Sequence, residues 1–248
     1  MKTAMLECFA LTNPGCIRKN NEDYCRLEPE LGIYALADGM GGANAGEQAS
    51  KLAVDSVVDL LRSSGQRDSQ GLLAAVEEAN RRVLLAAQQD SSLDGMGTTL
   101  LVALETGQEL AIASVGDSRA YLLDSAGLHI ITRDQTWVND VGRPLGLDEE
   151  SLRRHPMRHV LTMAIGAAGP LSINYYTVQL EPSALLLLSS DGLHGVVDAT
   201  DIERILRDGE PDGSLEAKCG SLIEAARSAG GPDNITAVLL RNSALRPH

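Results

Sequence analysis

The chain has 248 residues, of which 44% are hydrophobic, enough for one large α/β domain or two small ones. Its 34 acidic and 21 basic residues give a formal net charge of −13, which disfavours nucleic acid as a partner, and the few aromatic residues leave little for base stacking. No apolar run is long enough to span a membrane and the first residues lack the pattern of a signal peptide, so we expect a cytoplasmic monomer that does not insert into membranes.

In the first third of the chain, turn signals separate three short strands, predicted at residues 5–11, 23–27 and 31–37. The third leads directly into Asp38. Apolar residues at helical spacing then predict an amphipathic helix that begins near Asn44, where Asn44 and Glu47 resemble a capping box, and a second helix across residues 72–86.

From Gly97 the apolar period changes from helical to strand-like. An antiparallel meander is predicted with strands at residues 98–104, 109–115, 119–123 and 128–132. The polar stretch 133–169 then predicts a small helical flap. Later segments predict strands at 172–180, 185–189 and 235–240, helices at 198–207 and 215–227, and a frayed tail at 243–248.

Each predicted helix has a single apolar stripe, so it has one face to bury. We therefore expect an α+β fold, a four-layer α-β-β-α sandwich in which two antiparallel sheets are flanked by helix pairs. Alternating βαβ periodicity, which would indicate a doubly wound parallel sheet, is absent from the sequence. We expect one domain over residues 1–242, with the flap at about 134–169.

Four short acidic motifs place an aspartate beside a turn residue at the end of an apolar stretch: Asp38, Asp117, Asp191 and Asp233. Any one alone is more often only a turn. Asp38 and Asp191, however, follow nearly apolar runs that deliver a carboxylate to a sheet rim, where a cation would offset the burial of charge. Oxygen-rich motifs without histidine favour Mg²⁺ or Mn²⁺ over Zn²⁺, and the four cysteines show no CxxC pair that would bind zinc.

The segment from Arg18 to Asp23 adds a possible phosphate contact. The planar guanidinium of Arg18 can bind two phosphate oxygens, and Glu22 could orient a water; the alternative is a solvated loop. A Walker-type nucleotide loop is excluded because Glu47 stands where its lysine belongs, and no HExxH or GxSxG motif occurs. His194 could be a general acid, but a hydrogen-bonded structural histidine is the stronger interpretation. The pattern favours hydrolysis of phosphate esters.

Six motifs in order resemble the metal-dependent protein phosphatases related to protein phosphatase 2C (PPM family), in their bacterial serine/threonine form. They are the Arg18 to Asp23 segment, Asp38-Gly39-Met40-Gly41-Gly42, Gly97-Thr98-Thr99, Val115-Gly116-Asp117-Ser118-Arg119, Ser190-Asp191-Gly192 and Asp233-Asn234-Ile235-Thr236. The resemblance implies a signalling enzyme that hydrolyses phosphoserine and phosphothreonine in phosphorylated proteins through a metal-activated water, opposing a bacterial Ser/Thr kinase. The net charge of −13 then suggests substrates with basic flanks.

By motif position, the resemblance implies a binuclear Mn²⁺ or Mg²⁺ centre bridged by Asp38, with the Gly39 carbonyl on the second metal. Asp191 and Asp233 would hold the first metal, and Asp117 with Asp191 a weaker third. Arg18 would bind the substrate phosphate, and Glu22 would lie behind the metal ligands.

The chain departs from the family pattern where Met40, Ala43, Gln135 and Met163 replace frequent histidines or a basic residue, so no general acid is identified. Two alternatives therefore stay open. One is a catalytically weak regulator that binds phosphoproteins, and the other is a phosphatase of small-molecule esters on the same fold.

Overall fold

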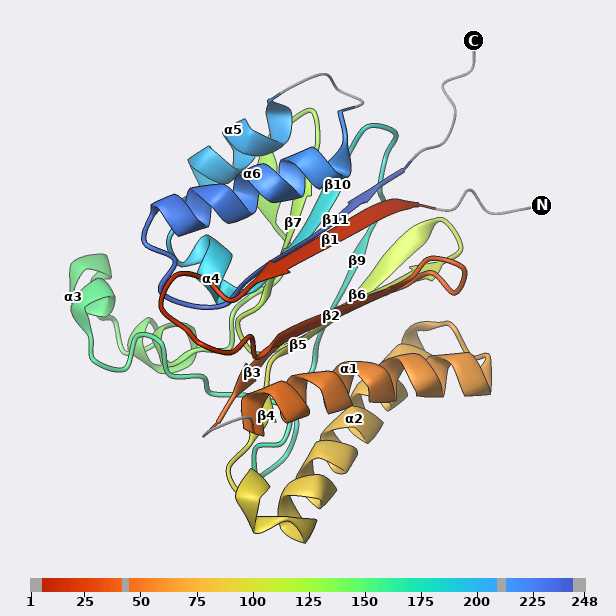
Figure 1. Cartoon of the computed structure of the whole chain (residues 1–248), viewed down its shortest axis with the longest axis vertical. Coiled ribbons are helices and arrows are strands. Elements are labelled where there is room, and N and C mark those ends of the chain that lie inside the picture. The colour runs from red at the N-terminus through yellow and green to blue at the C-terminus, as the bar shows by residue number, and fades with distance from the viewer. Residues whose placement is uncertain (1–5, 42–44, 209–212, 243–248) are drawn as a thin grey trace.

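Two antiparallel sheets form the centre of the molecule (Figure 1). The computed structural model describes residues 6–41, 45–208 and 213–242. The first sheet has the order β1 (Glu7–Asn13), β11 (Ile235–Arg241), β10 (Leu185–Ser189), β7 (Arg119–Leu123) and β8 (Leu128–Ile130). The second has the order β2 (Asp23–Glu28), β3 (Ile33–Met40), β5 (Leu100–Thr106), β6 (Glu109–Val115) and β9 (Asn174–Val178), with the short β4 (Gly97–Thr98) paired to β3.

Helices cover the outer face of each sheet. Helices α1 (Ala45–Ser64) and α2 (Ser69–Gln89), followed by the 3₁₀ turn Ser91–Leu93, pack on the second sheet. Helices α5 (Ala199–Arg207) and α6 (Leu215–Ser228), together with the short α4 (Asp191–His194), pack on the first. The four-layer sandwich predicted from the single apolar stripe of each helix is confirmed.

Three apolar clusters correspond to the interfaces between these layers. One lies between α1, α2 and the second sheet, another between α5, α6 and the first sheet, and a third fills the space between the sheets. Strand β3 contributes to two of them, because Ile33, Ala35 and Ala37 face the helices while Tyr34 and Leu36 face the other sheet. A strand buried on both faces explains why its sequence is a continuous apolar run.

The predicted meander is wrong, because its four strands divide between the two sheets. Strand β6 pairs with β5 and β9 in the second sheet, whereas β7 pairs with β10 and β8 in the first. Gly116, with φ of +98°, turns the chain between the sheets instead of into a hairpin. Local turn signals do not distinguish a hairpin from such a crossover, since both need the same residues.

The flap is a small helical segment, as expected, with a π-helical turn (Val138–Gly142) and α3 (Glu149–Arg154). The ring of Trp137 stacks on that of His155 with centroids 3.8 Å apart, and Leu152 of α3 is buried. The capping box at Asn44 and the tail at 243–248 lie outside the described residues. No helix in the described ranges is long and apolar enough to cross a bilayer.

Candidate active site

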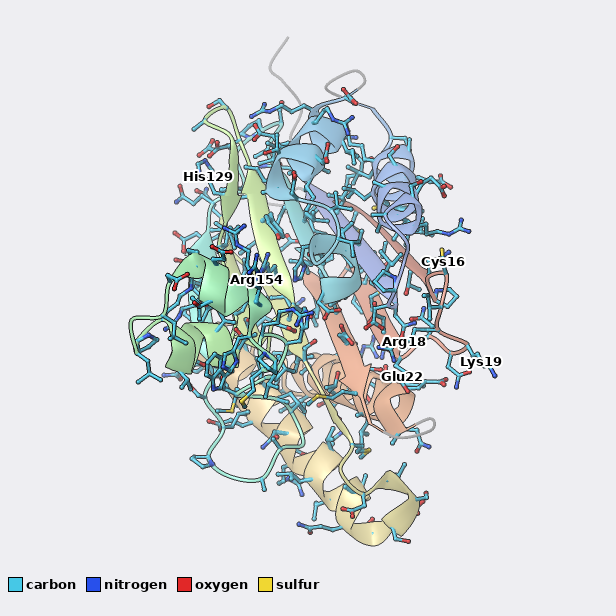
Figure 2. All side chains as sticks on the ribbon, turned by 90° about the vertical axis from the view of Figure 1, so that its left-hand side faces the viewer. Cys16, Arg18, Lys19, Glu22, His129 and Arg154 are labelled. Atoms are coloured by element: carbon cyan, nitrogen blue, oxygen red, sulfur yellow. The ribbon has the colours of Figure 1, made fainter. Side chains whose placement is uncertain are left out.

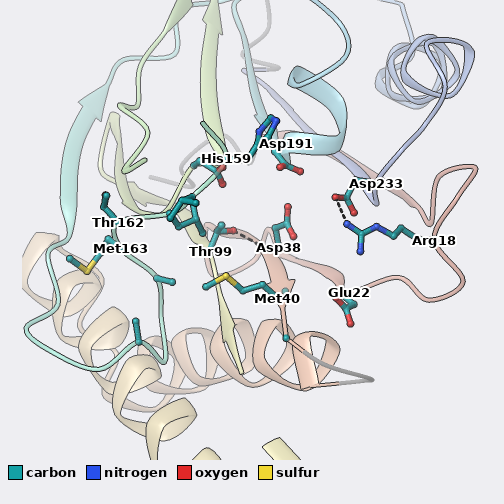
Figure 3. A pocket seen from close by; sticks show the side chains of 17 residues that line it. Arg18, Glu22, Asp38, Met40, Thr99, His159, Thr162, Met163, Asp191 and Asp233 are labelled. Atoms are coloured by element: carbon teal, nitrogen blue, oxygen red, sulfur yellow. Dashed lines mark hydrogen bonds and ion pairs between the residues drawn. The ribbon is translucent and has the colours of Figure 1, made fainter. Parts of the chain in front are cut away.

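A cavity of about 530 Å³ opens at one edge of the sandwich, where the two sheets and the flap meet (Figure 3). All seven residues proposed from the sequence line it: Arg18, Glu22, Asp38, Gly39, Asp117, Asp191 and Asp233. They come from the loop before β2, the end of β3, the β6–β7 crossover, the start of α4 and the loop before β11. The fold therefore brings five separate segments to one cavity.

Asp38 is fixed through its backbone at the end of β3. Its N–H donates to the Thr99 hydroxyl at 2.9 Å, and its carbonyl accepts from the Thr99 N–H at 2.9 Å and from the Thr98 hydroxyl at 2.8 Å. These bonds hold the backbone and leave the carboxyl group directed into the cavity. Thr99 Oγ1 also lies 2.8 Å from the Ser118 hydroxyl, which ties β3 to the crossover that carries Asp117.

The carboxyl groups of Asp38 and Asp191 point toward one another in the cavity (Figure 3). Like charges this close disfavour ionisation of both groups. Burial raises the pKa of Asp38 well above its usual range, and the nearby carboxylates of Asp23 and Asp191 raise it further. Burial and then Asp233 raise the pKa of Asp191 in the same way. A bound cation would offset the repulsion between these carboxylates.

Asp117 lies in the crossover between the sheets, and Gln135 at the start of the flap binds this crossover through Gly116. The Gly116 N–H donates to Gln135 Oε1 at 2.8 Å, and the Gln135 N–H donates to the Gly116 carbonyl at 2.9 Å. Burial, followed by the negative charges of Asp191 and Asp134, raises the pKa of Asp117 to about 7. Gln135 therefore supports the loop of a site carboxylate.

On the other side of the cavity, Arg18 donates to Asp233 Oδ2 at 2.8 Å. Asn234 fastens the loop that carries Arg18 and Glu22, because its side chain accepts from the Glu22 N–H at 2.8 Å and donates to the carbonyls of Pro14 and Asn20. Burial raises the pKa of Glu22, against the opposing effect of Arg18. Asn234 therefore helps to position Glu22 and Arg18, the candidate phosphate-binding residue.

Asp23 is a buried acid beneath the site that sequence reasoning did not single out. Its Oδ2 accepts from the hydroxyls of Ser190 at 2.7 Å and Thr236 at 2.6 Å, which joins β2 of the second sheet to the first sheet. Burial raises its pKa to about 7, against these two hydrogen bonds. The sequence marked Asp23 only as the last residue of the Arg18 to Asp23 segment. Its partners Ser190 and Thr236 belong to two of the other motifs.

The flap forms the remaining wall of the cavity, with a mainly apolar surface made by Val160, Leu161, Met163, Ala164 and Ala167, and His159 beside them. Sequence reasoning did not propose His159, whose charge lowers the pKa of Asp191. His194, in contrast, does not line the cavity. Its Nδ1 lies 2.9 Å from the Ser189 hydroxyl, and burial lowers its pKa well below the usual value, so the structural interpretation fits.

The donor set fits hydrated Mg²⁺ or Mn²⁺. Oδ1 of Asp191 and Oδ1 of Asp23 are buried without a hydrogen-bond partner, and such orphaned carboxylate oxygens are costly unless a cation or water reaches them. Within the described residues, no three acidic, histidine or cysteine side chains converge into a complete ligand set. Carboxylates that surround a cavity without converging suit Mg²⁺, because this ion keeps several of its waters in protein sites.

The raised pKa values predict that the metal-free protein loses stability as the pH rises from about 4 to about 7. In that range the native carboxyls of Asp23 and Asp117 still bind protons that the unfolded chain has released, so ionisation favours unfolding. The loss should be about 2 to 4 kcal/mol, measured by urea denaturation in EDTA. Saturating Mn²⁺ should remove the decline, and unchanged metal-free stability across this range would contradict the prediction.

Gly192 allows α4 to approach the loop before β11. A Cβ atom on Gly192 would lie 1.9 Å from the Asn234 carbonyl oxygen, which belongs to backbone and cannot move aside easily. Gly192→Ala should therefore cost about 3 kcal/mol of stability and displace Asp191. The matched control is Gly220→Ala in α6, where nothing lies within 4 Å and the helix should gain about 0.5 to 1 kcal/mol. Equal urea midpoints for the two variants would refute this account.

Comparison with known proteins identifies close similarity over nearly the whole chain. The family model described as protein phosphatase 2C matches residues 18–211. A serine/threonine phosphatase stp from Listeria welshimeri is 34% identical, with 95% of each chain covered. The crystal structure of the Mycobacterium tuberculosis serine/threonine phosphatase PstP/Ppp is 33% identical with a TM-score of 0.85, covering 95% of this chain and 98% of that one. A structure of the PstP catalytic domain in complex with two manganese ions is 31% identical, with a TM-score of 0.82 and coverage of 95% and 97%.

Proposed function

The chain belongs to the protein phosphatase 2C family, and from this premise we propose that it is a metal-dependent serine/threonine phosphatase that removes phosphate from phosphoserine and phosphothreonine in proteins. The proposal rests on one observation: four aspartates and Arg18 line the same cavity. The aspartates alone would serve any hard-metal hydrolase. A guanidinium beside them adds a group that recognises phosphate.

Asp38 would bridge two cations, with the Gly39 carbonyl on one and Asp191 and Asp233 on the other. Bound there, Mn²⁺ or Mg²⁺ would act as a Lewis acid and lower the pKa of a water. Asp117 and Asp191 would share a weaker third ion. The two ions in the related PstP structure support the first pair, and the facing carboxyl groups of Asp38 and Asp191 support their joint role.

The remaining work falls to protein side chains. Arg18 would leave Asp233 and bind two oxygens of the phosphate, which neutralises charge that spreads over these oxygens in the transition state. Glu22 lies beside Arg18 and would orient water through its carboxylate. The apolar flap wall excludes water from one side of the phosphoester, and this strengthens the electrostatic contacts within the cavity.

In the cell, the counterpart of such an enzyme would be a Ser/Thr kinase, and residues 1–242 would act as one monomeric unit in the cytoplasm. Support for a reducing compartment comes from the cysteines, since Cys8, Cys16, Cys25 and Cys219 are all free thiols.

The test is release of phosphate from a phosphothreonine peptide and from p-nitrophenyl phosphate, with Mn²⁺, with Mg²⁺ and with EDTA. Metal-dependent turnover of the peptide supports the proposal, with Asp191→Asn as the inactive control. Turnover of the small ester alone would favour a small-molecule phosphatase. Peptide binding without any turnover would favour a regulator that sequesters phosphoproteins.

A further inference from the structure

Nearly every arginine and lysine side chain in the described ranges already forms an ion pair or a hydrogen bond. Of the arginine and lysine side chains there, most form ion pairs, Arg67 donates to the Leu31 carbonyl, and Lys218 donates to two backbone carbonyls. Arg153, Arg158 and Lys19 are exposed and have neither an ion pair nor a hydrogen bond in this part of the chain. In a protein with a net charge of −13, free positive charge is therefore confined to a few positions.

Two of these three free cations lie in the short flap segment that leads into the wall of the cavity. Arg153 is in α3, and Arg158 comes directly before His159, Val160 and Leu161, which line the cavity. Arg154 lies between them and pairs with Glu150, but both side chains are more than 70% exposed, so this ion pair is weak and can exchange. Figure 2 shows Arg154 and Lys19 on opposite sides of Arg18 and Glu22.

The segment that carries these arginines is held firmly by the rest of the flap. Trp137 stacks on His155, and the Trp137 N–H donates to the Val160 carbonyl at 2.8 Å. Two turns are closed by backbone hydrogen bonds. The Arg158 N–H donates to the His155 carbonyl at 3.1 Å, and the Val160 N–H donates to the Met157 carbonyl at 3.0 Å. Because the backbone is already ordered, a partner that pairs with the two arginines orders only their side chains.

From this arrangement we infer that Arg153 and Arg158 form a docking surface for acidic residues that flank the phosphorylated residue of the substrate. The inference rests on the proposed function and names its substrate class. The net charge of the chain suggests basic flanks instead, but charges are screened over about 8 Å at physiological ionic strength, so a flank beside the mouth responds mainly to the nearest side chains. Among the basic side chains of the flap, Arg153 and Arg158 are the ones with no ion pair within the described residues, and a bound metal would offset the cavity carboxylates.

The experiment compares three phosphothreonine peptides that differ only in having acidic, neutral or basic flanks. The wild-type enzyme should cleave the acidic peptide with a kcat/KM about threefold to tenfold above the neutral one, as one or two exposed charge pairs allow. The double variant Arg153→Gln/Arg158→Gln should bring this ratio close to one, and 0.5 M salt should do the same for the wild type.

Arg67→Gln is the matched control. Arg67 is also exposed and forms no ion pair with the residues that the structure describes. It follows the far end of α1, a helix of 20 residues that spans about 30 Å from its start near Gly39. This variant should keep the acidic preference. Thermal denaturation should give the same midpoint for the double variant and the wild type, because the two flap arginines form no ion pair or side-chain hydrogen bond within the described residues.

Equal cleavage of acidic and neutral peptides by the wild type would overturn the inference, as would a preference that survives in the double variant. Either result leaves the proposed phosphatase intact. Failure to cleave any of the three peptides would instead overturn the proposed function, so the two failures are distinguishable.

Discussion

Asp38→Asn should abolish metal-dependent hydrolysis and at the same time stabilise the metal-free protein. The amide cannot bridge two cations, and losing several kcal/mol of electrostatic stabilisation in the transition state corresponds to a fall in kcat of roughly a thousandfold or more. The amide has nearly the size and shape of the carboxyl group, and the backbone bonds of residue 38 to Thr98 and Thr99 are untouched, so the local structure has no reason to change.

The stability gain follows from the raised pKa of Asp38. At pH 8 the unfolded chain ionises this carboxyl freely, whereas burial and neighbouring aspartates oppose ionisation in the native state, so the wild type loses stability there that the amide retains. We expect a gain of about 1 to 3 kcal/mol at pH 8 that falls to a few tenths of a kcal/mol near pH 4, where the native carboxyl is protonated and the unfolded one is only about half ionised. Urea denaturation in EDTA at both pH values measures it.

The control for this experiment is Asp59→Asn, which changes an exposed aspartate of α1 whose ion pair with Arg62 is 3.7 Å long. It should change neither the activity nor the pH dependence of stability. If Asp38→Asn keeps metal-dependent turnover, or if its stability gain is the same at pH 4 and pH 8, Asp38 has a different role from the one proposed.

Arg18→Ala should lower kcat/KM by roughly 10-fold to 100-fold for a phosphopeptide and for p-nitrophenyl phosphate alike, because both present the same phosphate. Inhibition by inorganic phosphate should weaken in parallel. Arg18→Lys should recover only part of the loss, since an ammonium group keeps the charge but not the two parallel hydrogen bonds. Steady-state kinetics with both substrates measures these effects.

A purely structural role for Arg18 would give a different outcome. Its ion pair with Asp233 is half-exposed and contributes at most about 1 kcal/mol, so the melting temperature should change little in Arg18→Ala. Arg227→Ala, which removes another exposed ion pair, is the matched control and should leave kinetics unaltered. A large loss of stability with an unchanged KM would refute phosphate binding by Arg18.

The fold was largely accessible from the sequence because its signals are local. Strands β6, β7 and β10 have the predicted bounds, and the helices after Asp198 and Ser214 begin where a capping side chain was available. The run predicted at residues 98–104 is instead broken at Thr99 into β4 and β5, because Thr99 binds Asp38 and Ser118 through its hydroxyl. A single strand pattern does not reveal such a side-chain bond.

By itself, the sequence determined which residues could carry the chemistry: aspartates after apolar runs, and an arginine before a strand. These are properties of neighbouring residues, and neighbouring residues are what a pattern records. The tertiary structure decided which sheet each strand joins, that the carboxyl groups of Asp38 and Asp191 face one another, that buried Asp23 joins the sheets, and that two flap arginines have no ion pair within the described residues. Each depends on contacts between distant segments, whose burial and charge exist only after the chain has folded.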